Sequence, residues 1–104
     1  MVSVSEAWKA WQEGFTNKDS NRLAEFLTDD FQFVPKSGTK NRQETLDWVD
    51  AGGNPTALDN LEVLYENDEV AVIYHSANRP NVVMALYTKR GDKFSHCRTV
   101  RQEV

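Results

Sequence analysis

The stretch Val82–Arg101, VVMALYTKRGDKFSHCRTVR, indicates two antiparallel strands joined by a tight turn. Val82–Lys89 and Phe94–Arg101 are rich in β-branched and aromatic residues, and Gly91 with the following aspartate supplies the turn between them. The preceding run, Val70–Ala77, has the same character. Three consecutive runs linked by short turns predict an antiparallel meander.

The first half of the chain has a helical period instead. Ser3 and Glu6 have capping-box spacing, Asp19 is a suitable cap for a second helix, and Asn41 with Glu44 repeats the capping-box spacing before a third. The apolar residues expected on the buried sides of these helices are Ala7, Trp8, Trp11, Phe15, Leu23, Phe26, Leu27, Leu46, Trp48 and Val49.

Two further strands complete the expected order of elements. Phe31–Pro35 alternates before the third helix, and Thr56–Glu66 alternates after it. Because most strands follow a block of helices, the order predicts an α+β fold rather than a parallel α/β sheet.

Composition limits the class of protein. The chain has 104 residues, 39% hydrophobic and 27% charged, which fits one globular domain spanning residues 1–104. The single cysteine, Cys97, excludes an internal disulfide framework. With no targeting signal and no apolar run long enough for a membrane, we expect a cytoplasmic protein without a membrane partner. The net charge of −4 argues against a nucleic-acid partner.

Charge is unevenly distributed along the chain. The segment Arg79–Arg101 holds six basic residues and one acidic residue, so it carries +5 and the remainder −9. This segment is either a groove that favours an anionic ligand or a solvated sheet face protected from edge pairing.

The order of elements resembles that of the NTF2-like superfamily, in its SnoaL-like and ketosteroid-isomerase-like branch. Trp11–Asp19, WQEGFTNKD, is similar to the end of the family's first helix and its turn. Leu23–Phe31, LAEFLTDDF, resembles the second helix and the entry to the first strand, and Tyr87–Phe94, YTKRGDKF, resembles the last hairpin.

The resemblance implies a cystatin-like cone, with three N-terminal helices packed on a strongly curved antiparallel sheet and a pocket at its open end. The family includes isomerases, dehydratases and cyclases as well as binding modules, so the fold alone does not choose among them. This sequence departs from the isomerase pattern. The positions matching the family's catalytic aspartate are Val34 and Pro35, and the position matching its tyrosine is Trp11.

His96 and Arg98 are the candidate catalytic residues. Alternation places both on the strand face of Phe94 and Val100, so we expect them to be buried, with a helix carboxylate from Asp29, Asp30 or Glu13 beside them. His96 would then carry a proton and Arg98 would stabilise negative charge, or both would simply hold sheet and helices together. A β-bulge would reverse the assignment beyond it.

Other candidates surround the expected pocket. Of Tyr74 and His75, which face opposite ways, only one can enter it. Cys97 is interpreted as a small buried residue rather than a nucleophile paired with His96, and no metal-ligand spacing is present. The expected ligand-binding residues are Trp11, Phe15, Phe33, Trp48, Tyr74 and Met84, with Trp11 and Trp48 bordering one cavity.

Two functions remain open. The first is a SnoaL-like pocket protein that binds or transforms a small, mostly apolar molecule by acid/base chemistry without a cofactor. The second is a non-catalytic dimerisation or ligand-binding module. In either case we expect a homodimer, formed through an outer sheet face with the apolar residues Ala71, Ile73, Val83, Ala85 and Tyr87.

Overall fold

The computed structural model describes residues 2–53, 58–77 and 81–102. Three helices are present in these ranges: α1 (Val4–Asn17), α2 (Asn21–Ala24) and α3 (Arg42–Asp50). The strands are β1 (Leu27–Val34), β2 (Lys40–Asn41), β3 (Leu58–Glu66), β4 (Val70–Ala77), β5 (Val82–Arg90) and β6 (Lys93–Gln102). Thr56 of the expected third strand and Arg79 of the basic segment lie outside the described residues. No helix in the described ranges is long and apolar enough to cross a membrane.

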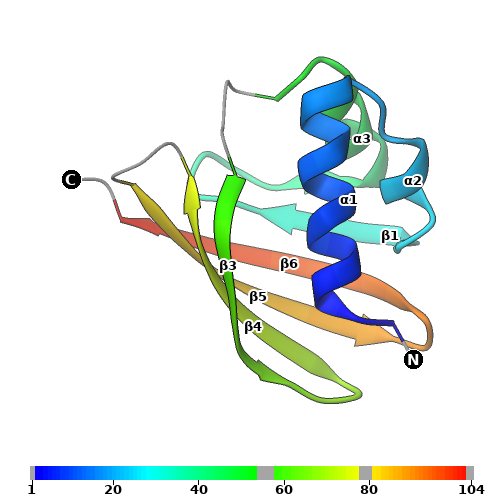
Figure 1. Ribbon diagram of the computed structural model, residues 1–104. Helices are drawn as coiled ribbons and strands as arrows, with labels where there is room; N and C mark the ends of the chain where they lie inside the picture. Colours follow the sequence, from blue (N-terminus) through cyan, green and yellow to red (C-terminus); the bar gives the residue numbers. More distant parts are fainter. Residues whose placement is uncertain (1, 54–57, 78–80, 103–104) are drawn as a thin grey trace.

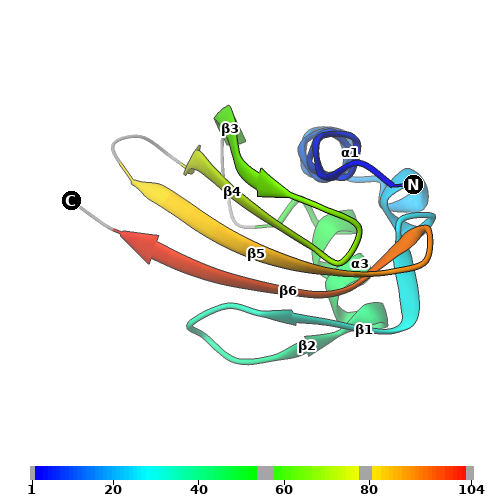
Figure 2. The ribbon, with the colours of Figure 1, turned by 90° about the horizontal axis from the view of Figure 1, so that it is seen from below.

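One curved, six-stranded sheet has the strand order β2-β1-β6-β5-β4-β3. The helices lie on its concave side. Helix α1 crosses over the sheet (Figure 1), and α3, drawn behind β6 and β1 in Figure 2, packs against β1. The α+β class with a curved sheet is thus confirmed, and a strand precedes the third helix as expected. The expectation of a purely antiparallel sheet is wrong, because β1 pairs with β6 in parallel.

Helix ends follow the local sequence. The Ser3 hydroxyl caps α1 by accepting from the backbone N–H of Ser5. Asn41 and Glu44 form the predicted reciprocal capping box at α3, with N–O distances of 3.0 and 2.8 Å. The second helix is only one turn long, since Leu27, expected on its buried side, already belongs to β1.

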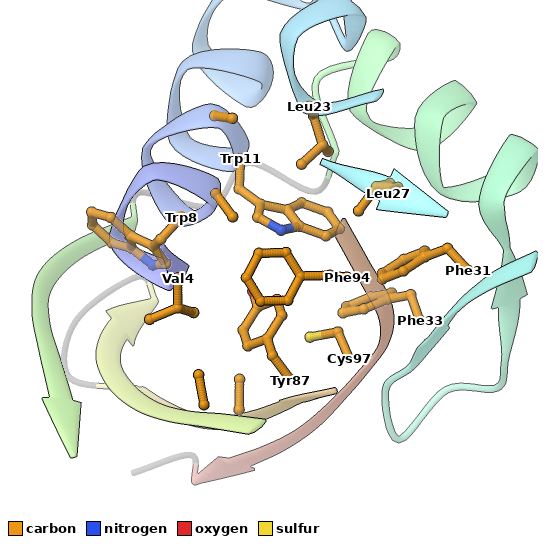
Figure 3. Packing of buried hydrophobic residues seen from close by; sticks show 14 of the residues in the cluster. Val4, Trp8, Trp11, Leu23, Leu27, Phe31, Phe33, Tyr87, Phe94 and Cys97 are labelled. Carbon is orange, nitrogen blue, oxygen red and sulfur yellow. The ribbon is translucent and has the colours of Figure 1, made fainter. Parts of the chain in front are cut away.

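The core lies between the helices and the concave face (Figure 3). Phe31, Phe94, Leu23 and Leu27 are among its fully buried side chains. Gly14 allows α1 to approach α3 closely, because a Cβ there would lie 2.8 Å from Val49 Cγ1. Packing of this kind fixes the distance between the helices that enclose the site.

An ion pair ties the start of α1 to the sheet. Glu66 Oε2 accepts from the backbone N–H of Val4 at 2.7 Å and from Lys89 Nζ at 2.9 Å. The Lys89 side chain has no exposed surface, whereas that of Glu66 is 27% exposed. Burial alone would raise the pKa of Glu66, but the Lys89 ammonium and the Val4 N–H outweigh it and the pKa is lowered.

A β-bulge changes which residues of β6 face the core. Thr88 pairs with His96 but the next residue, Lys89, pairs with Phe94, so Ser95 is an extra residue in β6. Phe94 and Cys97 are therefore both buried. The expected orientation of His96 and Arg98 is wrong for this reason: His96 is half-buried on the convex face and Arg98 is exposed.

The expected outer face of the sheet is also reversed. Ala71, Ile73, Val83, Ala85 and Tyr87 are all buried on the concave side. The apolar residues exposed on the convex side of β4, β5 and β6 are Tyr74, Met84, Leu86 and Val100. Both faces of these strands carry apolar residues. Alternation separates the residues of one face from those of the other, but it does not show which face packs against the helices.

Candidate functional site

A cavity of about 850 Å³ opens between the helices and the concave face of the sheet. Its walls come from α1, α3, the β1–β2 hairpin and the inner residues of β4, β5 and β6. A volume of this size accommodates an ordinary small organic molecule.

Four aromatic rings form a closed circuit along one wall. Trp11 contacts Phe15 and Phe33 at centroid distances of 5.9 and 5.5 Å. Trp48 completes the circuit, edge-on to Phe15 at 5.1 Å and stacked on Phe33 at 5.6 Å. The prediction that Trp11 and Trp48 border the same cavity is confirmed, and Phe15 and Phe33 border it too. That these four residues bind a ligand stays a prediction.

Tyr74 and Met84, also expected at the pocket, do not line the cavity. They pair with each other on the convex face, where 37% and 45% of their surfaces are exposed. His96 and Arg98 are likewise absent from the cavity walls. Asp30, one of the acids proposed to accompany them, instead pairs with Arg90, and this hydrogen bond lowers the pKa of Asp30.

His75 is the histidine that enters the cavity. It is 7% exposed, and its ring lies 5.7 Å from that of Trp8. Burial lowers the pKa of His75, and the Ser76 carbonyl opposes that shift only partly, so the imidazole is neutral at pH 7.

The hydrogen bond of His75 defines its tautomer. Nδ1 lies 3.0 Å from the Ser76 carbonyl oxygen. Because a carbonyl oxygen only accepts, Nδ1 carries the proton and Nε2 keeps a lone pair. No other hydrogen bond to this ring comes from the described residues. Nε2 is therefore a proton acceptor on a residue that lines the cavity.

Tyr87, which lines the cavity, and Cys97, which pairs with it in the sheet, do not ionise near neutral pH. Burial raises the pKa of Cys97 to about 12, although the Tyr87 hydroxyl partly opposes this. Burial also raises the pKa of Tyr87, which lines the cavity opposite Cys97 in the sheet. Cys97 is a buried residue, as expected, and both groups stay protonated.

Two indole N–H groups beside the cavity have no acceptor. Trp8 and Trp11 project from α1 toward the sheet (Figure 3), and each Nε1 is buried without a hydrogen-bond partner in the described part of the chain. An unpaired buried donor costs free energy, so these positions favour a nearby acceptor atom.

The charged residues that line the cavity are all basic: Lys36, Lys40 and Arg101. Lys40 is opposite Phe33 in the β1–β2 hairpin, and its Nζ lies 5.2 Å from the Trp48 ring centroid. Arg101 donates to the Ala77 carbonyl at 3.3 Å. Arg101 faces inward because the Ser95 bulge shifts β6 by one residue.

The sequence signals for these missed residues were weak but present. His75 has the same parity in β4 as Ile73 and Ala77, which are buried. Lys40 becomes a wall residue only through the register of a two-residue strand, which no alternation indicates. In the described ranges, no group of three or more His, Cys, Asp or Glu side chains is placed to hold a metal ion.

Structural comparison shows what this arrangement resembles. An NTF2-like protein from Anabaena variabilis superposes with a TM-score of 0.73 at 15% identity, covering 97% of this chain and 87% of that one. The chain has the NTF2-like fold. A SnoaL-like protein of unknown function from Burkholderia thailandensis matches this fold with a TM-score of 0.73 at 9% identity, covering 99% and 100% of the two chains.

A third structure with the NTF2-like fold carries a small molecule. A protein from Catenulispora acidiphila with a ketosteroid-isomerase-like fold, in complex with trimethylamine, matches with a TM-score of 0.60 at 16% identity, covering 91% of this chain and 84% of that one. No family model matches the sequence, and no curated protein matches it. The resemblance expected from the sequence is thus confirmed at the level of the fold.

Proposed function

We propose that this protein binds a small, mostly apolar molecule in the aromatic cavity and that His75 Nε2 removes a proton from it. The observation that carries the proposal is the His75 tautomer, which leaves a lone pair on Nε2 of a residue that lines the aromatic cavity. The complex of the Catenulispora protein with trimethylamine supports small-molecule binding in this fold.

The chemistry is proton transfer without a cofactor, of the isomerase, dehydratase or cyclase type. His75 Nε2 takes a proton from a carbon acid, the electron pair moves to an adjacent carbonyl oxygen, and the proton returns to another atom of the ligand or to a leaving group. His75, Val83 and Arg101 are neighbours across three strands. The two outer Cα atoms of such a row are about 10 Å apart, so Arg101 can stabilise the developing oxyanion across a small ligand.

The test uses hydrogen–deuterium exchange of 2-tetralone, an apolar bicyclic ketone with acidic C–H bonds. We expect the wild-type protein to accelerate exchange, and His75→Gln to lower the acceleration by about 10²–10⁴-fold. His96→Gln, which changes the other histidine on the convex face, is the matched control and should have no effect. Acceleration that survives His75→Gln, or none by the wild type, would exclude His75 as the base.

The pH profile offers an independent check. Only neutral imidazole accepts a proton, and the pKa of His75 is lowered. The rate should therefore rise with pH through a value below 6.5 and then level off. Native mass spectrometry of the purified protein would reveal a ligand that co-purifies.

A second function is favoured by the convex face. Tyr74, Met84 and Val100 lie in one cross-strand row, with Leu86 in the next row, and all four are exposed. We propose that this set, rather than the residues first expected, forms a homodimer interface, as a non-catalytic dimerisation module would require.

Sedimentation equilibrium tests the dimer. Wild-type protein should sediment at twice the monomer mass of 11.9 kDa, and Met84→Lys should give monomer. Asp68→Asn, at the exposed β3–β4 turn, changes the net charge equally and should leave the dimer intact. A wild-type monomer at high micromolar concentration would refute this interface.

A further inference from the structure

We infer that the ligand of the aromatic cavity is an aromatic carboxylate, and that Lys40 holds its anionic group at the rim. The inference rests on the proposed function, because it names the class of molecule that the cavity takes. Three features support it: the shape of the aromatic wall, the position of Lys40, and the sign of the charges around the opening.

The aromatic wall suits a planar body. Trp48 and Phe33 are stacked with an interplanar angle of 24°, while Phe15 and Trp48 meet edge to face at 78°. Rings arranged in this way offer both faces and edges to an inserted aromatic ring, and such contacts add to the gain from burial. An aliphatic chain would bury area without using this geometry.

Lys40 is fixed at the end of the same wall. It pairs with Phe33 in the β1–β2 hairpin, so the two side chains are on the same face of the hairpin. Its ammonium lies 5.2 Å from the Trp48 centroid, and its side chain is half-buried. A ring seated against Phe33 and Trp48 would therefore bring a carboxylate substituent within reach of Lys40 Nζ.

Among the described residues, the ammonium of Lys40 has no acidic partner. Elsewhere, Lys89 pairs with Glu66 and Arg90 pairs with Asp30. In the described residues no carboxylate pairs with Lys36 or Lys40, and no aspartate or glutamate lines the cavity. A half-buried cation without a counter-ion favours binding of an anion.

The local charge opposes that of the whole chain. The protein carries −4, yet the charged residues at the cavity, Lys36, Lys40 and Arg101, are all positive. An anion is attracted to such an opening. A cation is also favoured by the aromatic faces, but it is repelled by the like charges of Lys36 and Lys40. Of two ligands with the same ring, the charges at the opening therefore favour the anionic one over the cationic one.

Three probes with one ring system test the inference by calorimetry at low ionic strength: 2-naphthoate, 2-naphthamide and 2-naphthylmethylammonium. We expect naphthoate to bind at least about tenfold more tightly than the amide, because only the carboxylate forms a charge-assisted hydrogen bond with Lys40. The ammonium compound should bind most weakly. Added salt should reduce the advantage of naphthoate, because the rim is accessible to solvent.

Variants assign the effect to Lys40. Lys40→Gln should bring naphthoate down to the affinity of the amide and leave the amide unchanged. Lys40→Glu should reverse the order and favour the ammonium probe. Lys9→Gln removes an equal charge from the exposed side of α1 and should change nothing.

The outcomes separate this inference from the proposed function. If all three probes bind equally, or the ammonium compound binds best, the anionic ligand class is wrong while the cavity remains a binding site. If naphthoate is preferred equally by wild type and Lys40→Gln, Lys40 does not hold the anion. If no probe binds to the wild-type protein, both the inference and the proposed function are refuted.

Discussion

Loss of either partner of the Lys89–Glu66 pair should destabilise the protein by very different amounts. In Glu66→Gln, the amide oxygen can still accept from Val4 N–H and Lys89 Nζ, but a fully buried ammonium loses its counter-charge. Removing one partner of a buried pair costs about 3–5 kcal/mol. Because the Glu66 side chain is 27% exposed, we expect the lower end of that range, about 3 kcal/mol.

Lys89→Met should cost less, about 1 kcal/mol. Methionine fills most of the same space, and the remaining carboxylate keeps its hydrogen bond from Val4 and its exposed surface. Unfolding in urea at pH 7 gives both free energies. As a control, Asp30→Asn breaks the exposed Arg90–Asp30 pair and should leave the midpoint unchanged.

The order of the two values is the decisive result. A cost for Lys89→Met equal to or above that for Glu66→Gln would show that the buried ammonium is not the unstable partner. The pH dependence provides a second check. Since the pKa of Glu66 is lowered from 4.5, the wild type should lose this contribution as pH falls below 4.5 and through the lowered value. Glu66→Gln should lack that part of the acid transition.

Three further outcomes are expected. Gly14→Ala should lower the free energy of unfolding by about 1–3 kcal/mol in urea, despite alanine's helix propensity, because its Cβ would clash with Val49. Cys97, with its pKa raised to about 12, should react with a thiol reagent only after unfolding; rapid labelling of the native protein would contradict its burial. Because the pKa of His75 is lowered from 6.5, protonation opposes folding, so stability should fall as pH drops below 6.5. In His75→Gln, the melting temperature should therefore vary less with pH below 6.5 than it does in the wild type.

Local features of the sequence were sufficient to predict most elements. The Asn41–Glu44 capping box and the strand Val70–Ala77 are both as predicted, because neighbouring residues determine them. The parallel pairing of β1 with β6 was not predicted. It joins residues 64 to 67 positions apart, and nothing in either segment specifies the partner.

The cavity walls were predicted on α1, on α3 and at Phe33 of β1, and were missed on β4, β5 and β6. Trp11 and Trp48 were assigned to the cavity from helical spacing and the family resemblance, and the structure places them there. His96 and Arg98 do not face the cavity, because one extra residue in β6, Ser95, exchanges the two faces of the strand beyond it. Alternation allows only one of Tyr74 and His75 to enter the pocket; Tyr74 was expected there, but His75 is the buried one.

The position of β6 in the sheet has a consequence for synthesis on the ribosome. β6 lies between β1 and β5, although it is the last strand of the sheet in chain order. Until Lys93–Gln102 has left the ribosome, β1 has no partner on that side and the hydrophobic surface beneath α1 stays incomplete. Bacterial and eukaryotic ribosomes add about 5–20 residues per second, so the nascent chain exposes an unpaired strand edge for seconds. Chains stalled before Phe94 should therefore be sensitive to protease.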